Sequence, residues 1–392
     1  MGLFTHNMVQ NITIGNSVRI LNGDMSYAFY NCTNFNSPIN IPSGVTNLAY
    51  AFNACIKLNS PINIPFGVVN MANTFSNCAV FNSPVNIPSS VTKANRLLYF
   101  ASMFNSTVTF GEGISNLDAS SMFEMCYNFN RPITLPNGVT NMYRTFAVCS
   151  NFNQPVSIPD TVVNAEYVFF SCNKFNAPVD IGNGVENLIN AFSACPNFNQ
   201  PITIPASVKN ISNMFNNCMM FNSVVTFPEN VTSSLNMTNA FLKANKFNKP
   251  ITIPNGTTDM ISTFNMASSF NQPINIPNGV INMTMAFNGC TNLRQDITVP
   301  ESVTNLVKTF AYCNNIGNIT ILATNINNMA GLLNYKRNNL RVNVFVPAGS
   351  TTNTKAGYNN SLSLAGYSMT LVTNSTNNCK YNATRNIYIY WV

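Results

Sequence analysis

Residues 32–54 read CTNFNSPINIPSGVTNLAYAFNA, and residues 55–77 repeat the phrase as CIKLNSPINIPFGVVNMANTFSN. The residue that begins each copy, here called the anchor, recurs every 23 residues, except for spacings of 25 before Cys126 and 26 before Ala244. Such a period is typical of a solenoid, in which each coil buries its apolar side only against its neighbours. The sequence therefore predicts about 13 stacked coils, with anchors at Cys32, Cys55, Cys78, Ala101, Cys126, Cys149, Cys172, Cys195, Cys218, Ala244, Ala267, Cys290 and Cys313.

Each copy holds one segment with the pattern of a short strand. Ile39 and Ile41 alternate with Asn40 between two prolines, which predicts a short parallel strand with both isoleucines inward and Asn40 outward. Residues 45–52 are expected to form a helical turn or a tight corner. The outward position, here called the outward row, is a candidate recognition surface, and its candidate residues are Asn40, Asn63, Asn86, Thr109, Thr134, Thr203, Thr226 and Thr252.

Phenylalanine recurs three residues before and three residues after the anchor, as Phe52 and Phe81 illustrate. Two such ladders would stack as the spine of a core. Because Ala replaces Cys at three anchors, the anchor is predicted to be a small buried apolar position with free, reduced thiols. Asparagine follows the second Phe in most coils, as at Asn36, and is predicted to be a buried amide that bonds the backbone of a turn.

Three phrases carry a resemblance to a known repeat. Residues 286–293 (AFNGCTNL), 270–274 (FNQPI) and 213–215 (NMF) resemble the BspA-type leucine-rich repeat and the related repeat of mycoplasma surface lipoproteins, over residues 10–347. Arg294 and Gly317 depart from the pattern by replacing the Asn, and Val224 and Asp296 replace the first Pro. The resemblance implies a leucine-rich-repeat solenoid used for adhesion or recognition on a cell or particle, without catalytic residues.

The ends of the chain differ from its repeats. We expect an N-terminal cap over residues 1–22, a solenoid over 23–347, and a cap or docking segment over 348–392, whose last run alternates like an edge strand. Of the net charge of +7, residues 1–301 contribute nothing, with 12 Lys and Arg against 12 Asp and Glu. The basic, aromatic end is therefore a candidate partner-binding or homo-oligomerisation surface, through Arg341, Lys355, Lys380, Arg385, Tyr388, Tyr390 and Trp391.

Several classes of function lack support in the sequence. The one histidine, His6, lies outside the repeats, and the acidic residues are scattered singly, so we predict no enzyme, no catalytic or metal site and no cofactor. The neutral repeats lack the basic stripe that nucleic acid requires, and no apolar run is long enough to span a membrane.

Two functional hypotheses remain. In the first, the chain is a virion component, such as a bacteriophage head or decorating fibre, assembled in the bacterial cytoplasm and contacting the host surface. Free thiols and the lack of a leader-like segment in residues 1–10 favour it. In the alternative, it is a BspA-type adhesin, on the cell surface or secreted. Expected partners are other virion or surface proteins and a host glycan or surface protein; the regular outward row also leaves ice or crystal binding open.

Overall fold

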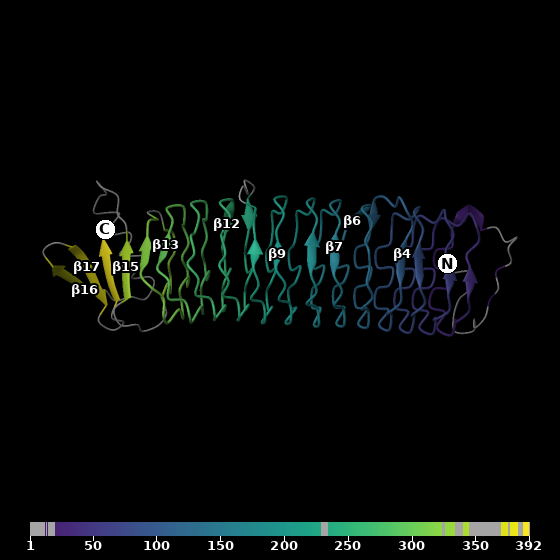
Figure 1. Cartoon of the computed structure of the whole chain (residues 1–392), viewed down its shortest axis with the longest axis horizontal. Coiled ribbons are helices and arrows are strands. Elements are labelled where there is room, and N and C mark those ends of the chain that lie inside the picture. Colours follow the sequence, from purple (N-terminus) through teal and green to yellow (C-terminus); the bar gives the residue numbers. More distant parts are fainter. Residues whose placement is uncertain are drawn as a thin grey trace. The chain divides into compact units, whose positions relative to one another are not determined.

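The computed structural model describes Ile12, Ile14, residues 20–228, 234–323 and 326–333, and the backbone of four strands between residues 340 and 391. The chain divides into two compact units, Met1–Gln200 and Pro201–Val392, which are treated separately. Within each unit, successive coils of about 23 residues lie side by side (Figure 1). This arrangement confirms the predicted solenoid. The described residues contain one helical element, the 3₁₀ turn η1 (Leu21–Gly23).

In the first unit, one side of the coils carries short parallel strands and is here called the strand face. The pairing is in register, with Ile39 opposite Ile62, one period later. Prolines before and after the segment keep the strands short, because proline cannot donate to the ladder. Three two-stranded sheets result, from β1 (Ile39–Asn40) with β2 (Ile62–Asn63), β3 (Val85–Ile87) with β4 (Val108–Phe110), and β7 (Val156–Ile158) with β8 (Val179–Ile181).

A second column of backbone pairing, the second face, begins seven residues after the outward position of a regular coil. Single parallel bridges join Asp24 to Asn47 and Asn47 to Asn70. The side chain of Asn47 accepts a hydrogen bond from the N–H of Ala49 at 3.1 Å, so the asparagine also shapes the following corner. At this column β5 (Leu117–Asp118) pairs with β6 (Val139–Asn141).

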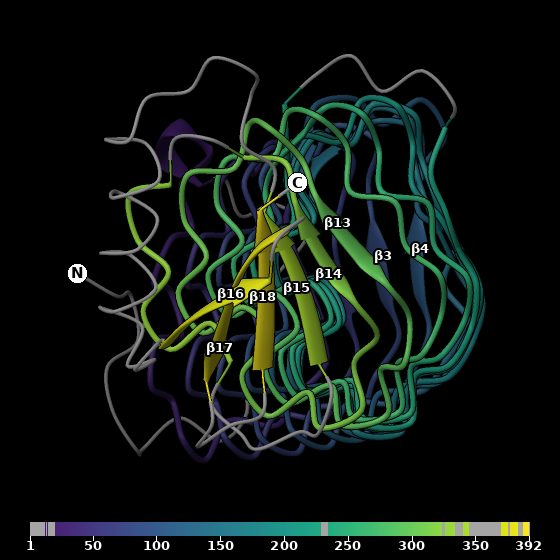
Figure 2. The same ribbon diagram turned by 90° about the vertical axis from the view of Figure 1, so that its left-hand side faces the viewer.

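The second unit repeats both columns. On its strand face β9 (Ile202–Thr203) pairs with β10 (Val225–Thr226), and on its second face β11 (Leu235–Asn236) pairs with β12 (Thr257–Asp259). A six-stranded sheet follows, in the order β13-β14-β15-β18-β17-β16 (Figure 2). Its strands are β13 (Ile297–Val299), β14 (Ile319–Ile321), β15 (Leu340–Val344), β16 (Thr370–Asn374), β17 (Asn377–Asn382) and β18 (Ile387–Trp391).

The expected edge strand at the C-terminus is an interior strand instead. β18 runs parallel to β15 on one side and antiparallel to β17 on the other, and β16 forms the edge. The sheet of the last coils is thereby continued by three strands from outside the repeats. This long-range pairing could not be read from the alternation of residues 386–392 alone.

The core consists of the two predicted phenylalanine ladders, and their burial is confirmed. Phe146 is fully buried and stacks on Phe152 of its own coil at a centroid distance of 4.7 Å. It also stacks on Phe123 of the preceding coil at 5.5 Å and on Phe169 of the following coil at 5.6 Å. Every coil interface near this position is therefore held by aromatic contact across the period.

The corner between the second face and the anchor is a tight corner rather than a helical turn. Tyr50 and Ala54 have φ values of 58° and 61°, and the same two positions are left-handed in neighbouring coils. This conformation costs a non-glycine residue about 1–2 kcal/mol. Hydrogen bonds between coils offset the cost, since the N–H groups of Tyr50 and Phe52 donate to the carbonyls of Ala72 and Thr74 at 2.9 and 3.0 Å.

Three strands expected on the strand face are not formed. Residues 132–136, 250–254 and 273–277 carry the proline-flanked pattern, yet each is irregular in the structure. The first two follow the two coils with long spacings, whose additional residues lie between the strand and the second face. In these coils the extra length allows β5–β6 and β11–β12 to pair at the second face. The strand face is unpaired there, and it is also unpaired between β2 and β3.

Candidate functional site

The outward row is the surface that the structure presents most regularly. All eight predicted residues are exposed, while the flanking residues Ile39, Val85 and Ile202 are buried. Six of the eight lie on strands, whereas Thr134 and Thr252 lie on the irregular segments. Neighbouring members bond one another where their chemistry allows: Asn63 Nδ2 donates to Asn40 Oδ1 at 2.5 Å, and Thr109 Oγ1 donates to Asn86 Oδ1 at 2.5 Å.

The asparagines that follow the second Phe hydrogen-bond as predicted, but they are not buried. The side-chain oxygen of Asn36 accepts the backbone N–H of Asn59 at 2.8 Å, and Asn59 does the same for Asn82 at 2.7 Å. These three residues are exposed. The corner already lies at the surface, so the amide can satisfy the backbone of the next coil without being buried.

The predicted partner-binding residues at the C-terminus fall where little is described. Lys355 and Arg385 lie outside the described residues, and for the others only the backbone is described. The strand register places Arg341 opposite Tyr388 and Val344 opposite Trp391. Lys380 is opposite Ile389, and Tyr390 is opposite Cys379. Their role as a docking surface stays a prediction, as does the N-terminal cap.

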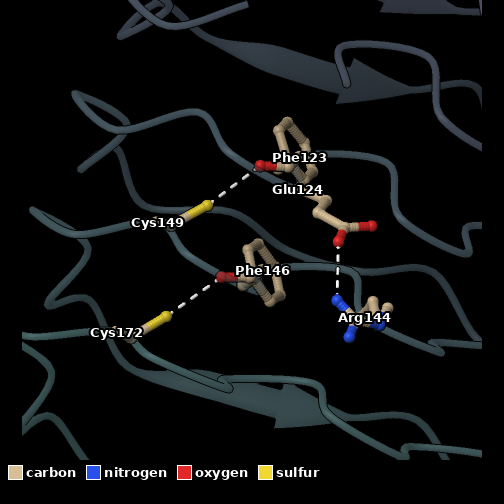
Figure 3. Close-up of polar contacts among 6 residues, drawn as sticks. All are labelled: Phe123, Glu124, Arg144, Phe146, Cys149 and Cys172. Atoms are coloured by element: carbon tan, nitrogen blue, oxygen red, sulfur yellow. Dashed lines mark hydrogen bonds and ion pairs between the residues drawn. The ribbon is translucent and has the colours of Figure 1, made fainter. Parts of the chain in front are cut away.

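The anchor thiols are free and buried, and each is used inside the core. Cys149 Sγ donates to the carbonyl oxygen of Phe123 at 3.0 Å, and Cys172 Sγ donates to that of Phe146 at 3.0 Å (Figure 3). Burial raises the pKa of the Cys55, Cys195 and Cys313 thiols to about 12. A nucleophilic cysteine needs a lowered pKa and access to solvent. These thiols have neither, so they are structural.

A charged and aromatic cluster stands on the corner of the first unit. Glu124 is almost buried and receives a hydrogen bond from Arg144 Nη1 at 2.7 Å (Figure 3). The guanidinium also lies 4.8 Å from the ring centroid of Tyr167 and 5.8 Å from that of Phe170. The sequence reasoning missed this cluster. Aligning the repeats could have found it, because Glu124 stands two residues before the anchor Cys126, and Arg144 stands five residues before the next anchor, Cys149.

The comparison with protein families decides where the chain belongs. The model of DUF285, described as a Mycoplasma protein of unknown function, matches residues 3–116, 89–180, 110–204, 140–255, 186–299 and 254–341. The chain belongs to the DUF285 family. No functionally curated protein matches it significantly. The family's own description assigns no activity, so the function must be argued from the surface.

One solved structure confirms the leucine-rich-repeat fold of this DUF285 protein, and two others were also matched. A leucine-rich repeat protein from Bacteroides ovatus is 20% identical, with a TM-score of 0.56 over 85% of this chain and 82% of that one. A leucine-rich cell surface protein from Faecalibacterium prausnitzii is 22% identical, with a TM-score of 0.38 over 76% and 75% of the two chains. The pneumococcal vaccine antigen PcpA is 18% identical, with a TM-score of 0.42 over 78% and 82%.

Two further observations concern the described part of this DUF285 chain. No three His, Cys, Asp or Glu side chains gather there as a metal site would require. No helix within those residues is long and apolar enough to cross a bilayer.

Removing the arginine of the corner cluster should destabilise the first unit. Arg144→Ala would leave the Glu124 carboxylate buried without its cation, and we expect a loss of about 2 kcal/mol in unfolding free energy, since the guanidinium is partly solvated. Urea unfolding followed by circular dichroism measures it. Ala147 holds the position of Glu124 in the next coil, so the double variant Glu124→Ala/Arg144→Ala should recover most of the loss. Equal stability of Arg144→Ala and the wild type would contradict the argument.

Proposed function

We propose that this protein is a non-enzymatic recognition protein of the cell surface that adheres to its target through the strand face. The observation that carries the proposal is the outward row, an exposed column of short polar side chains repeated at the coil spacing in each unit. Asn and Thr offer hydrogen-bond donors and acceptors at regular intervals, and each contact would be weak. Binding would then gain strength from many copies engaged together.

The family supports a cellular origin for this function. A family described as mycoplasmal favours a surface adhesin over a virion component, for which the sequence offers only free thiols and the character of residues 1–10. The leucine-rich-repeat fold supports recognition over catalysis, since solenoids of this kind present extended surfaces. The exposed row likewise supports recognition over catalysis.

Adhesion can be tested with beads that carry many copies of the chain. We expect coated beads to bind cultured epithelial cells above beads coated with serum albumin, because avidity compensates for weak single contacts. The triple variant Asn63→Lys, Asn86→Lys, Thr109→Lys should reduce binding several-fold, because long charged side chains would cover the row.

A matched control adds the same charge on another column. Lys57 and Lys174 occupy the position two residues after the anchor, so Asn128→Lys, Asn151→Lys, Asn197→Lys introduces residues that other coils already carry there. These control beads should bind like the wild type. Equal loss in both triple variants, or no binding above albumin, would refute the proposal.

A further inference from the structure

The strand face of the second unit is open between β10 and β13. Among the described residues, the backbone N–H groups of Ile251, Ile253, Ile274 and Ile276 make no backbone hydrogen bond to a neighbouring coil. Where two strands pair, as in β1 and β2, the equivalent groups of Ile39 and Ile41 donate to Pro61 and Asn63, whereas those of Ile62 and Ile64, between β2 and β3, make no such bond. On the second face the same coils stay bonded, as Met237 N–H donates to Asp259 and Met260 N–H to Asn282.

One of the coils beside the gap is longer than the regular coil. The outward residue of a regular coil stands seven residues before the second face, whereas ten residues separate Thr226 from Asn236. The coil with Thr109 and Asp118 is also longer, and its strand face is likewise unpaired on the side of residues 132–136. Pairing on the strand face is thus lost after both insertions, as it also is between β2 and β3 in coils of regular length, while the second face stays bonded.

A groove occupies the opening. It has a volume of about 1030 Å³ and crosses four coils, at residues 224–227, 250–255, 273–275 and 294–298. The outward residues Thr226, Thr252, Asn275 and Thr298 line it, with Pro250 and Pro273 between them. A smaller hollow of about 440 Å³ marks the equivalent place in the first unit, between residues 107–113 and 132–136. The surface is thus elongated, and it alternates hydroxyl and amide groups with small apolar ones.

The lining of the groove holds one cation and one anion, Arg294 and Asp296. Arg294 replaces the repeat's asparagine, and its side chain forms no ion pair with any described residue. The nearby carboxylate of Asp296 is already engaged, because its oxygens accept the backbone N–H of Asn318 at 2.6 Å and the side-chain N–H of Asn318 at 3.4 Å. The guanidinium of Arg294 is therefore the group of the groove lining that can meet an anion, while Asp296 is bonded to Asn318.

We propose that this groove binds an acidic oligosaccharide of several sugar units. The proposal rests on the proposed function and names its ligand class. Sugar rings present hydroxyl edges and small apolar faces, which match the alternation of Thr and Asn with Pro and Ile in the groove. The unpaired backbone amides would supply further donors, and a carboxylate on the sugar would meet the guanidinium of Arg294. A peptide strand that pairs with the open backbone is the alternative that the experiment distinguishes.

The experiment screens the whole chain on an array of neutral, uronic-acid-containing and sialylated oligosaccharides, then titrates the best ligand by calorimetry. Arg294→Asn restores the residue of the other repeats and should weaken an acidic ligand at least tenfold. Arg96→Asn is the control, since Asn73 and Asn190 hold that position in other coils, and it should bind like the wild type. Hydrogen exchange should show protection of residues 250–276 on binding.

The possible outcomes tell failure of the groove proposal apart from failure of the adhesion proposal. If the beads adhere but the protein binds no oligosaccharide, the groove proposal fails and the proposed function stands. The same holds if Arg294→Asn leaves oligosaccharide binding unchanged. An acidic peptide that protects residues 250–276 where no oligosaccharide does would overturn the ligand class. Oligosaccharide binding that requires Arg294 supports the groove even if the beads fail on the cells chosen, in which case the strand-face adhesion proposal fails by itself.

Discussion

Raising the pH from 8 to 10 should unfold the protein, because the buried thiols must stay protonated in the folded state. An ordinary thiol has a pKa of 9.0, and burial raises it to about 12 at Cys55, Cys195 and Cys313 and well above 9.0 at Cys78, Cys149, Cys172 and Cys290. Cys126 is raised in the same way. Between pH 9 and 12 the folded state therefore binds more protons than the unfolded state, so stability falls as pH rises.

The size of the effect comes from the number of thiols. At pH 10 an unfolded thiol with a pKa of 9 gains about 1.4 kcal/mol from deprotonation, so these eight thiols together favour unfolding by about 11 kcal/mol. This is comparable with the whole stability of a typical domain, about 5–15 kcal/mol. Below pH 8 the thiols are protonated in both states and should contribute no pH dependence.

The measurement is urea unfolding at several pH values with a reductant present. The control replaces the eight cysteines by alanine, the residue that Ala101, Ala244 and Ala267 carry at the anchor. This variant should be less stable at pH 7, since it loses the sulfur contacts, but its unfolding free energy should change little between pH 8 and 10. The same alkaline slope in both proteins would mean that groups other than the thiols titrate on unfolding.

The period alone was enough to predict the solenoid, because each side chain that recurs at 23 residues must meet its own copy in the next coil. Phe52, Phe75 and the anchors could be assigned to the core for this reason, and their burial confirms it. The exposure of Asn40 and Thr203 followed from strand alternation in the same way. The hydrogen bonds that asparagine makes to the following coil were predicted, but its exposure was not.

The corners and the open groove could not be predicted, for different physical reasons. Left-handed backbone occurs at Tyr50, Ala54 and Arg144, residue types with no preference for it, because bonds between coils impose the conformation. The groove lies where the strand face is unpaired between β10 and β13, while β11 and β12 pair on the second face. The sequence showed the extra residues before Ala244 but not where pairing would be lost.

Phe146→Ala should be the most damaging single substitution in the middle of the first unit. The ring is fully buried and stacks on Phe123, Phe152 and Phe169, so its removal leaves a cavity that the flanking coils cannot close without breaking their own contacts. We expect a loss of about 3–5 kcal/mol, the range for a large core aromatic. Urea unfolding measures the loss.

The part of the solenoid that loses stability in Phe146→Ala can be located, because a solenoid is stabilised by contacts between neighbouring coils. Hydrogen exchange should become faster first in residues 123–172 of the Phe146→Ala variant, around the weakened interfaces. The control is Phe66→Ser: Phe66 is 78% exposed, and Ser43 and Ser89 hold its position in the adjacent coils. It should change stability by less than about 0.5 kcal/mol. An unchanged melting temperature for Phe146→Ala would show that the aromatic ladder does not hold the coils together, and the core assignment would fail with it.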